Sequence, residues 1–184
     1  CTPKQNMHSK SNSTMEIDTT QTEKRPVVFI SYSWDDTAHE VWVLQLADDM
    51  RTKYGIDVIL DKWEVKLGKH LPDFMANSVK KADRVICVLT PNYKKKSDGL
   101  TGGVGVEYSI ISAEIQKNIR TEKFIPLFKS GNIVDDIPMF LEGRDFVDMR
   151  DEAKYNEKIE ELVRDIWNKP KYKKPQLGEI PKFD

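Results

Sequence analysis

Apolar and polar positions follow one another along this chain in blocks that predict strands and helices in turn. Short apolar runs with the length and composition of strands occur at residues 27–31, 57–60, 84–89, 123–128 and, more weakly, 144–148. Apolar residues recur at helical spacing over about residues 37–54, 71–81, 104–118 and 153–168. Repeated strand–helix units of this kind predict a parallel sheet with helices on both faces.

Local signals place some of the boundaries between these elements. Thr37, followed three residues later by Glu40, has the spacing of a capping box and predicts the start of the first helix. Gly55 predicts its end. Pro126 is unusual for a central strand, because proline cannot donate a hydrogen bond to a neighbouring strand.

Two polar stretches lie between the predicted elements, and we interpret both as loops. One covers residues 61–69, and the other is a glycine-rich stretch from Thr90 to Gly103. The first follows the second predicted strand, and the second follows the third.

Composition changes sharply at both ends of the chain. Residues 1–24 contain almost nothing apolar, so we expect a disordered leader. Residues 169–184 contain three prolines in a basic stretch, which predicts an extended linker or a strap along the surface. The region between them, 25–168, is long enough for one domain.

Net charge and cysteine content argue against several classes of function for this protein. The net charge is −1 with acids and bases interspersed, which gives no electrostatic case for direct binding to nucleic acid or to an anionic membrane. No apolar run approaches the roughly 20 residues that span a bilayer. The two cysteines, Cys1 and Cys87, form neither a disulfide framework nor a metal site, and Cys87 is expected in the core. We therefore expect a cytoplasmic protein.

The candidate chemistry lies where predicted strands end. Tyr32, Ser33 and Trp34 follow the first strand directly, and ligands bind at the carboxyl ends of the strands in an open parallel sheet. A Gly-Gly-Val-Gly-Val-Glu-Tyr segment at residues 102–108 opens the third helix. Asp35 and Asp36 resemble the acidic pair of receiver domains, but Thr90 stands where the phosphate-accepting aspartate would be.

The Phe-Ile-Ser-Tyr-Ser motif at 29–33, the loop 61–68 and a glutamate early in the third helix together resemble the Toll/interleukin-1 receptor (TIR) family, at its bacterial border with SEFIR domains. The resemblance covers about residues 26–167. It implies a flavodoxin-like α/β fold with a five-stranded parallel sheet in the order 2-1-3-4-5. Many members of the family cleave NAD+ at the bond between nicotinamide and ribose.

Glu107 is the residue that the resemblance identifies as catalytic. Nicotinamide leaves as a neutral molecule, so the reaction needs no general acid, and one carboxylate near the ribose can stabilise the oxocarbenium-like transition state. From its position alone, Glu107 would merely complement the positive end of its helix. The family's enzymes commonly have tryptophan four residues earlier, where this chain has Gly103.

Further residues follow from the matching loops. The resemblance assigns substrate binding to Tyr32, Ser33, Trp34, Lys66, Gly68 and His70. It assigns self-association to the loop after the second strand, through Asp61, Trp63, Val65 and Leu67. Trp63 could instead pack on its own helix, and His70 could be an ordinary helix-start residue. No cofactor or metal is expected, since NAD+ is the substrate.

The function expected from the sequence is therefore a TIR-domain NAD+ glycohydrolase that acts once it self-assembles. It would be the effector of a bacterial immune or cell-death system, such as antiviral defence, with a fused or partner sensor domain. The alternative is a non-catalytic TIR or SEFIR adaptor that acts only by homotypic protein–protein interaction. Glu107 favours the enzyme, whereas Gly103, at the position where the family's enzymes commonly have tryptophan, favours the adaptor.

Overall fold

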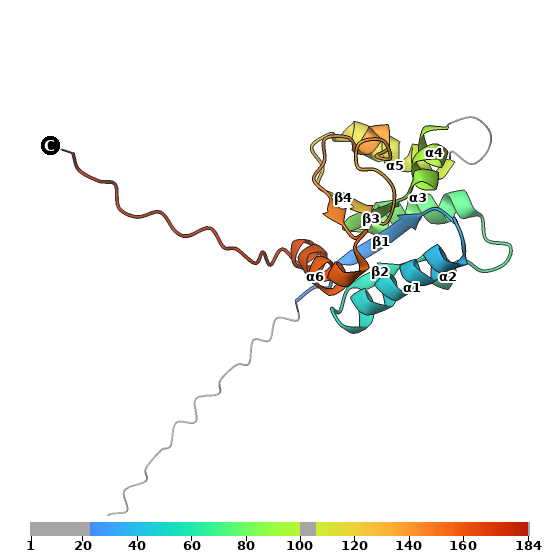
Figure 1. Ribbon diagram of the computed structural model, residues 1–184, viewed down its shortest axis with the longest axis horizontal. Coiled ribbons are helices and arrows are strands. Elements are labelled where there is room, and N and C mark those ends of the chain that lie inside the picture. Colours follow the sequence, from blue (N-terminus) through green and yellow to red (C-terminus); the bar gives the residue numbers. More distant parts are fainter. Residues whose placement is uncertain (1–22, 100–105, 184) are drawn as a thin grey trace, which may run out of the picture.

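One parallel sheet in the order β2-β1-β3-β4-β5 organises the computed structural model, which describes residues 23–99 and 106–183 (Figure 1). The strands are β1 (Val27–Tyr32), β2 (Asp57–Ile59), β3 (Arg84–Leu89), β4 (Phe124–Phe128) and β5 (Val147–Asp148). The α-helices are α1 (Thr37–Thr52), α2 (Asp61–Glu64), α3 (Leu71–Lys81), α4 (Pro91–Asp98), α5 (Val106–Lys117) and α6 (Tyr155–Ile166). Two 3₁₀ turns are η1 (Met139–Leu141) and η2 (Glu152–Lys154). The predicted flavodoxin-like order is confirmed.

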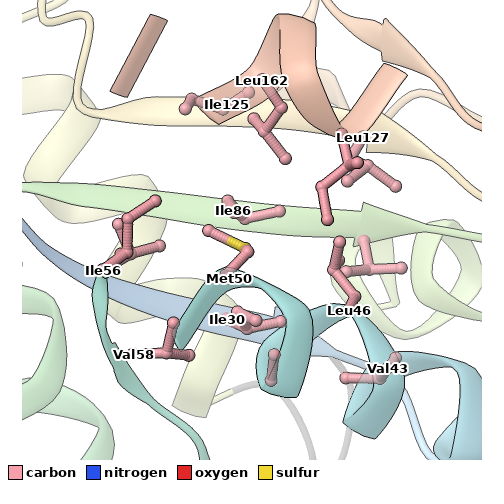
Figure 2. Packing of buried hydrophobic residues seen from close by; sticks show 14 of the residues in the cluster. Ile30, Val43, Leu46, Met50, Ile56, Val58, Ile86, Ile125, Leu127 and Leu162 are labelled. Carbon is pink, nitrogen blue, oxygen red and sulfur yellow. The ribbon is translucent and has the colours of Figure 1, made fainter. Parts of the chain in front are cut away.

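Alternate residues of the strands belong to two separate hydrophobic cores, because successive side chains in a strand point to opposite faces of the sheet. On one face, α1 and α6 cover Ile30 and Ile86, and Figure 2 shows Met50 of α1 beside them. On the other face, α3 and α5 pack against residues such as Phe29 and Cys87. Cys87 is fully buried, as predicted.

The stretch from Thr90 to Gly103 is not simply a loop, because its first half forms helix α4. The Thr90 hydroxyl accepts a hydrogen bond from the Tyr93 N–H at 3.1 Å and caps the helix. Pro91 stands at the first helical position, where its missing N–H costs nothing. Tyr93 is completely buried and fixes the helix on the sheet. The glycine-rich second half of this stretch lies largely outside the described residues.

Two smaller differences from the sequence-based prediction concern helix starts. The first helix is capped by Asp36 rather than Thr37, since Asp36 Oδ1 accepts a hydrogen bond from the His39 N–H at 2.8 Å. The segment 61–69 was predicted to be a loop throughout, but it begins with the single helical turn of α2.

Pro126 lies within β4, yet all five residues of that strand are buried. Strand β5 is only two residues long and pairs with β4 at Leu127 and Phe128, after the proline. Pro126 is therefore in the part of β4 that has a strand partner on one side only, next to β3. The missing N–H is tolerated there because no β5 residue pairs with it.

Regular structure in the described residues runs from Val27 to Ile166. The predicted leader falls almost entirely outside the description. Residues 173–183 contain no helix or strand and run away from the domain (Figure 1). None of the described helices combines the length and the apolar character that crossing a membrane requires.

Candidate functional site

Asp61 joins the loop after β1 to the start of α2. Its Oδ1 accepts a hydrogen bond from the Tyr32 hydroxyl at 2.8 Å, and its Oδ2 accepts one from Trp34 Nε1 at 3.1 Å. Burial, with the neighbouring Asp61 carboxylate, raises the pKa of Tyr32 far above its usual value, so the phenol keeps its proton and donates. Tyr32 and Trp34, both predicted for substrate binding, therefore donate to the carboxylate of Asp61, which was predicted for self-association.

Trp34 presents an exposed indole at this edge. The side chain is 55% exposed, although its ring nitrogen is held by Asp61. Lys62 Nζ lies 5.2 Å from the ring centroid, within the range of a cation–π contact, and forms an ion pair with Glu40 at 3.0 Å. The ring is thus fixed in position with a surface left open to solvent.

A second polar cluster bridges the ends of β1 and β3. The Ser33 hydroxyl donates to Asp35 and lies 3.2 Å from the Thr90 hydroxyl, while Asn92 Nδ2 donates to Asp35 Oδ1 at 2.7 Å. Burial opposes ionisation of Asp35, but hydrogen bonds from Ser33, Asn92 and Thr90 outweigh it and hold the pKa below its usual value.

Asp35 and Asn92 were not predicted to lie in the site. The available signal was the presence of polar side chains directly after both β1 and β3, which are neighbours at the point where the strand order reverses.

His39 is a buried histidine in the first turn of α1, close to Tyr32. It is 8% exposed, and its Nε2 has no hydrogen-bond partner among the described residues. Its ring centroid lies 6.2 Å from that of Tyr32. Burial lowers the pKa of His39 despite the nearby charges of Asp35 and Asp36, so the imidazole is neutral at neutral pH.

Glu107 is the second residue of α5, but its side chain lies outside the described residues. The next residue, Tyr108, packs edge-on against Tyr93 with ring centroids 4.9 Å apart. The Tyr93 hydroxyl lies 3.0 Å from Ser31 Oγ, inside hydrogen-bonding distance. These contacts connect the beginning of α5 to the end of β1, one residue before Tyr32.

The residues predicted for self-association differ in exposure. Val65 packs against the core beside α3, whereas Leu67 is completely exposed. Trp63 is 42% exposed, and the Arg51 guanidinium of α1 lies 5.9 Å from its ring centroid. The tryptophan therefore packs partly on its own domain and still offers apolar surface.

Lys66, Gly68 and His70 lie further along the same loop and are exposed. Gly68 has a φ of +85°, a backbone conformation that favours glycine, and nothing lies within 4 Å of where a Cβ would be. His70 Nδ1 lies 3.1 Å from Asp73 Oδ2. Among the described residues, no hydrogen bond or ion pair joins Lys66 or His70 to the Tyr32–Trp34 segment, and their role in substrate binding stays a prediction.

A cavity of about 340 Å³ lies beside this loop and α3, with Ile59, Lys69 and His70 among its lining residues. A much larger groove opens elsewhere, between α5 and α6, away from the Tyr32–Trp34 segment. Within residues 23–99 and 106–183, no cluster of three or more His, Cys, Asp or Glu side chains is arranged to hold a metal ion.

Comparisons with known proteins agree with this architecture. A family model described as the TIR domain matches residues 28–163. The crystal structure of a prokaryotic SEFIR domain is 37% identical, with a TM-score of 0.68, and the match covers 83% of this chain and 99% of that one. No curated protein sequence matches the chain.

Two more distant structures share the fold. A TIR domain of the Toll-related receptor TRR-2 from Hydra magnipapillata is 18% identical, with a TM-score of 0.54 over 76% of this chain and 96% of that one. The other is that of the TIR domains of the activated Roq1 resistosome, which directly recognises the pathogen effector XopQ. These domains are 20% identical, with a TM-score of 0.54 over 77% of this chain and 99% of that one.

Proposed function

Since this chain belongs to the TIR-domain family, we propose that it cleaves NAD+ between nicotinamide and ribose, with Glu107 as the catalytic carboxylate. The observation that supports this most is the contact series from Tyr108 through Tyr93 to Ser31. It anchors the first turn of α5 beside the end of β1. In open parallel sheets that edge is where ligands bind.

Cleavage of the bond between nicotinamide and ribose requires few catalytic groups. The bond to be broken carries a positive charge on the nicotinamide nitrogen, and cleavage returns that electron pair to the ring. The leaving group departs neutral, so one carboxylate that stabilises positive charge on the ribose can suffice. Water then adds to the ribose carbon in hydrolysis.

Trp34 supplies the aromatic surface that Gly103 does not provide. Its exposed indole lies next to Tyr32 and is fixed through Asp61. Flat aromatic groups such as nicotinamide or adenine stack on such surfaces. Lys62, which now lies over the ring, would be displaced or would turn toward the phosphates of the substrate.

Self-assembly would control this activity. Leu67 and Trp63 expose apolar side chains on one loop, which is typical of a protein–protein contact. Asp61, in the same segment, is bonded to Tyr32 and Trp34, so a neighbour that docks on the loop acts on the substrate-binding edge as well. A fused or partner sensor domain would raise the local concentration and start assembly.

The second candidate is an adaptor that self-associates without catalysis. The same exposed loop favours it. It is also favoured by Gly103, which stands where the family's enzymes commonly have tryptophan. The two candidates differ in one measurable product, free nicotinamide.

The deciding experiment incubates the protein with NAD+ over a hundredfold range of protein concentration and measures nicotinamide by chromatography. Sedimentation of the same samples reports the oligomeric state. Nicotinamide release that rises with the oligomeric fraction supports the enzyme. Oligomers that release none, at any concentration, overturn the catalytic proposal in favour of the adaptor.

A further inference from the structure

A groove of about 1520 Å³ opens at the β5 edge of the sheet, between α5 and α6. It exists because β5 is so short. Strand β5 pairs with β4 only at Leu127 and Phe128, so the first part of β4 has no strand beside it on that side. Phe124 and Ile125, from this part of β4, line the groove.

The groove combines aromatic walls with an acidic rim. Phe124, Phe140 and Phe146 are among its lining residues. Its lining includes eight acidic and five basic residues, and four of the acids, Glu157, Glu160, Glu161 and Asp165, come from α6. Exposed ion pairs occupy three of these four, and such pairs exchange partners at little cost.

The segment 173–183 starts at the rim of this groove, because Pro170, Lys171 and Tyr172 are themselves lining residues. Within it, Leu177, Ile180 and Phe183 are almost completely exposed. Pro175 and Pro181 favour the polyproline II conformation, which has three residues per turn, so these three apolar side chains form one stripe. The segment also contains three lysines and one glutamate.

We propose that the segment 173–183 folds back and docks in this groove of its own chain. Proline-rich segments bind aromatic-lined grooves in the polyproline II conformation. Here the apolar stripe would contact the phenylalanines, and the lysines would face the acids of α6. Attachment at Tyr172 holds the segment at high effective concentration, which favours its own groove over that of another copy.

The dimensions allow this docking. Eleven residues in the polyproline II conformation extend about 34 Å at about 3.1 Å each. Helix α6, which forms one wall, has 12 residues and is therefore about 18 Å long. The segment can turn after Tyr172 and still run the length of the wall. A partner that binds the α5–α6 face would have to displace it.

Disulfide trapping tests the proposal in the full chain. Ser112→Cys places a thiol on a lining residue of the groove, and Ile180→Cys places one on the stripe. Cys1→Ser removes the other thiol of the sequence besides buried Cys87. The matched control is Glu114→Cys with Ile180→Cys, since Glu114 is on the same helix but does not line the groove.

We expect a cross-linked monomer that forms at least about tenfold faster with Ser112→Cys than with Glu114→Cys, because docking raises the local thiol concentration. Adding Leu177→Ser and Phe183→Ser should bring the rate down to the control value. Equal rates for the two positions overturn docking in the groove. A cross-linked dimer overturns docking within one chain, because it means that the segment occupies the groove of a second copy.

Discussion

The Tyr32 hydroxyl donates a hydrogen bond to Asp61 Oδ1 over 2.8 Å, and this contact ties the end of β1 to the start of α2. The second oxygen of Asp61 holds the Trp34 indole. The segment proposed for substrate binding and the segment proposed for self-association are thus not independent. A neighbour that moves Asp61, at the start of the loop 61–69, must also move Tyr32 and Trp34 or break these bonds.

Tyr32→Phe should separate the two segments while leaving the core packed. It removes one hydrogen bond to a charged acceptor, which costs about 1–3 kcal/mol of stability, or roughly 2–4 °C of melting temperature per kcal/mol. The matched control is Tyr155→Phe, which removes the 2.9 Å bond from Tyr155 to Asp49 elsewhere in the molecule. We expect similar melting temperatures for both variants, but slower nicotinamide release only in Tyr32→Phe. Equal release from both would mean that the bond has only a structural role.

Stability should decrease as the pH falls from about 6.5, the usual pKa of histidine, because burial depresses the pKa of His39 below that value. The unfolded chain then binds more protons than the folded one in this window, so the free energy of unfolding rises with pH there and falls on acidification. The residues whose charges act on His39 are Asp35, Asp36, Glu40 and Lys129.

Chemical denaturation of wild type and His39→Leu between pH 5 and pH 8 measures this effect. The wild type should lose stability through the lower half of that range, and the variant should show a flatter profile. The pKa of the Asp35 carboxyl is also held below its usual value, so Asp35 is ionised in this window and does not contribute there. Identical slopes for the two proteins would mean that His39 is not the group that titrates.

The strands and the long helices could be predicted because they depend on periodicity, which is local, whereas the sheet order was expected from the resemblance to the TIR family. Helix α4 could not be predicted this way, since Tyr93 is the only large apolar residue in it. The signal that was present was a capping residue followed by proline, Thr90 and Pro91. The choice between Asp36 and Thr37 as the cap was also open, because both are good capping residues.

The site depends on contacts between distant positions, and sequence patterns do not give these. Tyr32 and Asp61 are 29 residues apart, and Asp35 and Asn92 are 57 apart. Their contact follows from β2 and β3 both pairing with β1 and from the direction of each side chain. The sequence therefore predicted that the loops after β1 and β2 belong to the candidate site, but not that the Asp61 carboxylate connects them or that Asn92 bonds to Asp35.

Glu107→Gln should nearly abolish nicotinamide release. The change keeps the shape and removes the charge, and losing a key electrostatic stabiliser costs about 100- to 1000-fold in rate. The control is Glu114→Gln on the same helix, whose carboxylate forms an exposed ion pair with Lys117 at 2.6 Å. It should keep activity close to wild type. A large drop in melting temperature for Glu107→Gln, with activity retained, would instead assign Glu107 to the helix N-terminus alone.

Leu67→Ser should weaken self-association without affecting folding, because the side chain is completely exposed in the single chain. If Leu67 is an anchor of the contact, its loss costs about 2 kcal/mol, or roughly 30-fold in the dissociation constant. Trp63→Ala should act in the same direction. Gly68→Arg is a less clean probe, since the φ of +85° at Gly68 strains any other residue.

The control for this loop is Val134→Ser, which removes another exposed apolar side chain outside it. Sedimentation gives the dissociation constant of each variant, and the concentration at which specific activity reaches half its maximum should shift in parallel with it. That parallel shift is expected from the proposal that a neighbour docked on this loop acts on Tyr32 and Trp34 through Asp61. Specific activity that stays flat over a hundredfold range of concentration, in wild type and in Leu67→Ser alike, would show that the monomer is competent and that assembly does not control it.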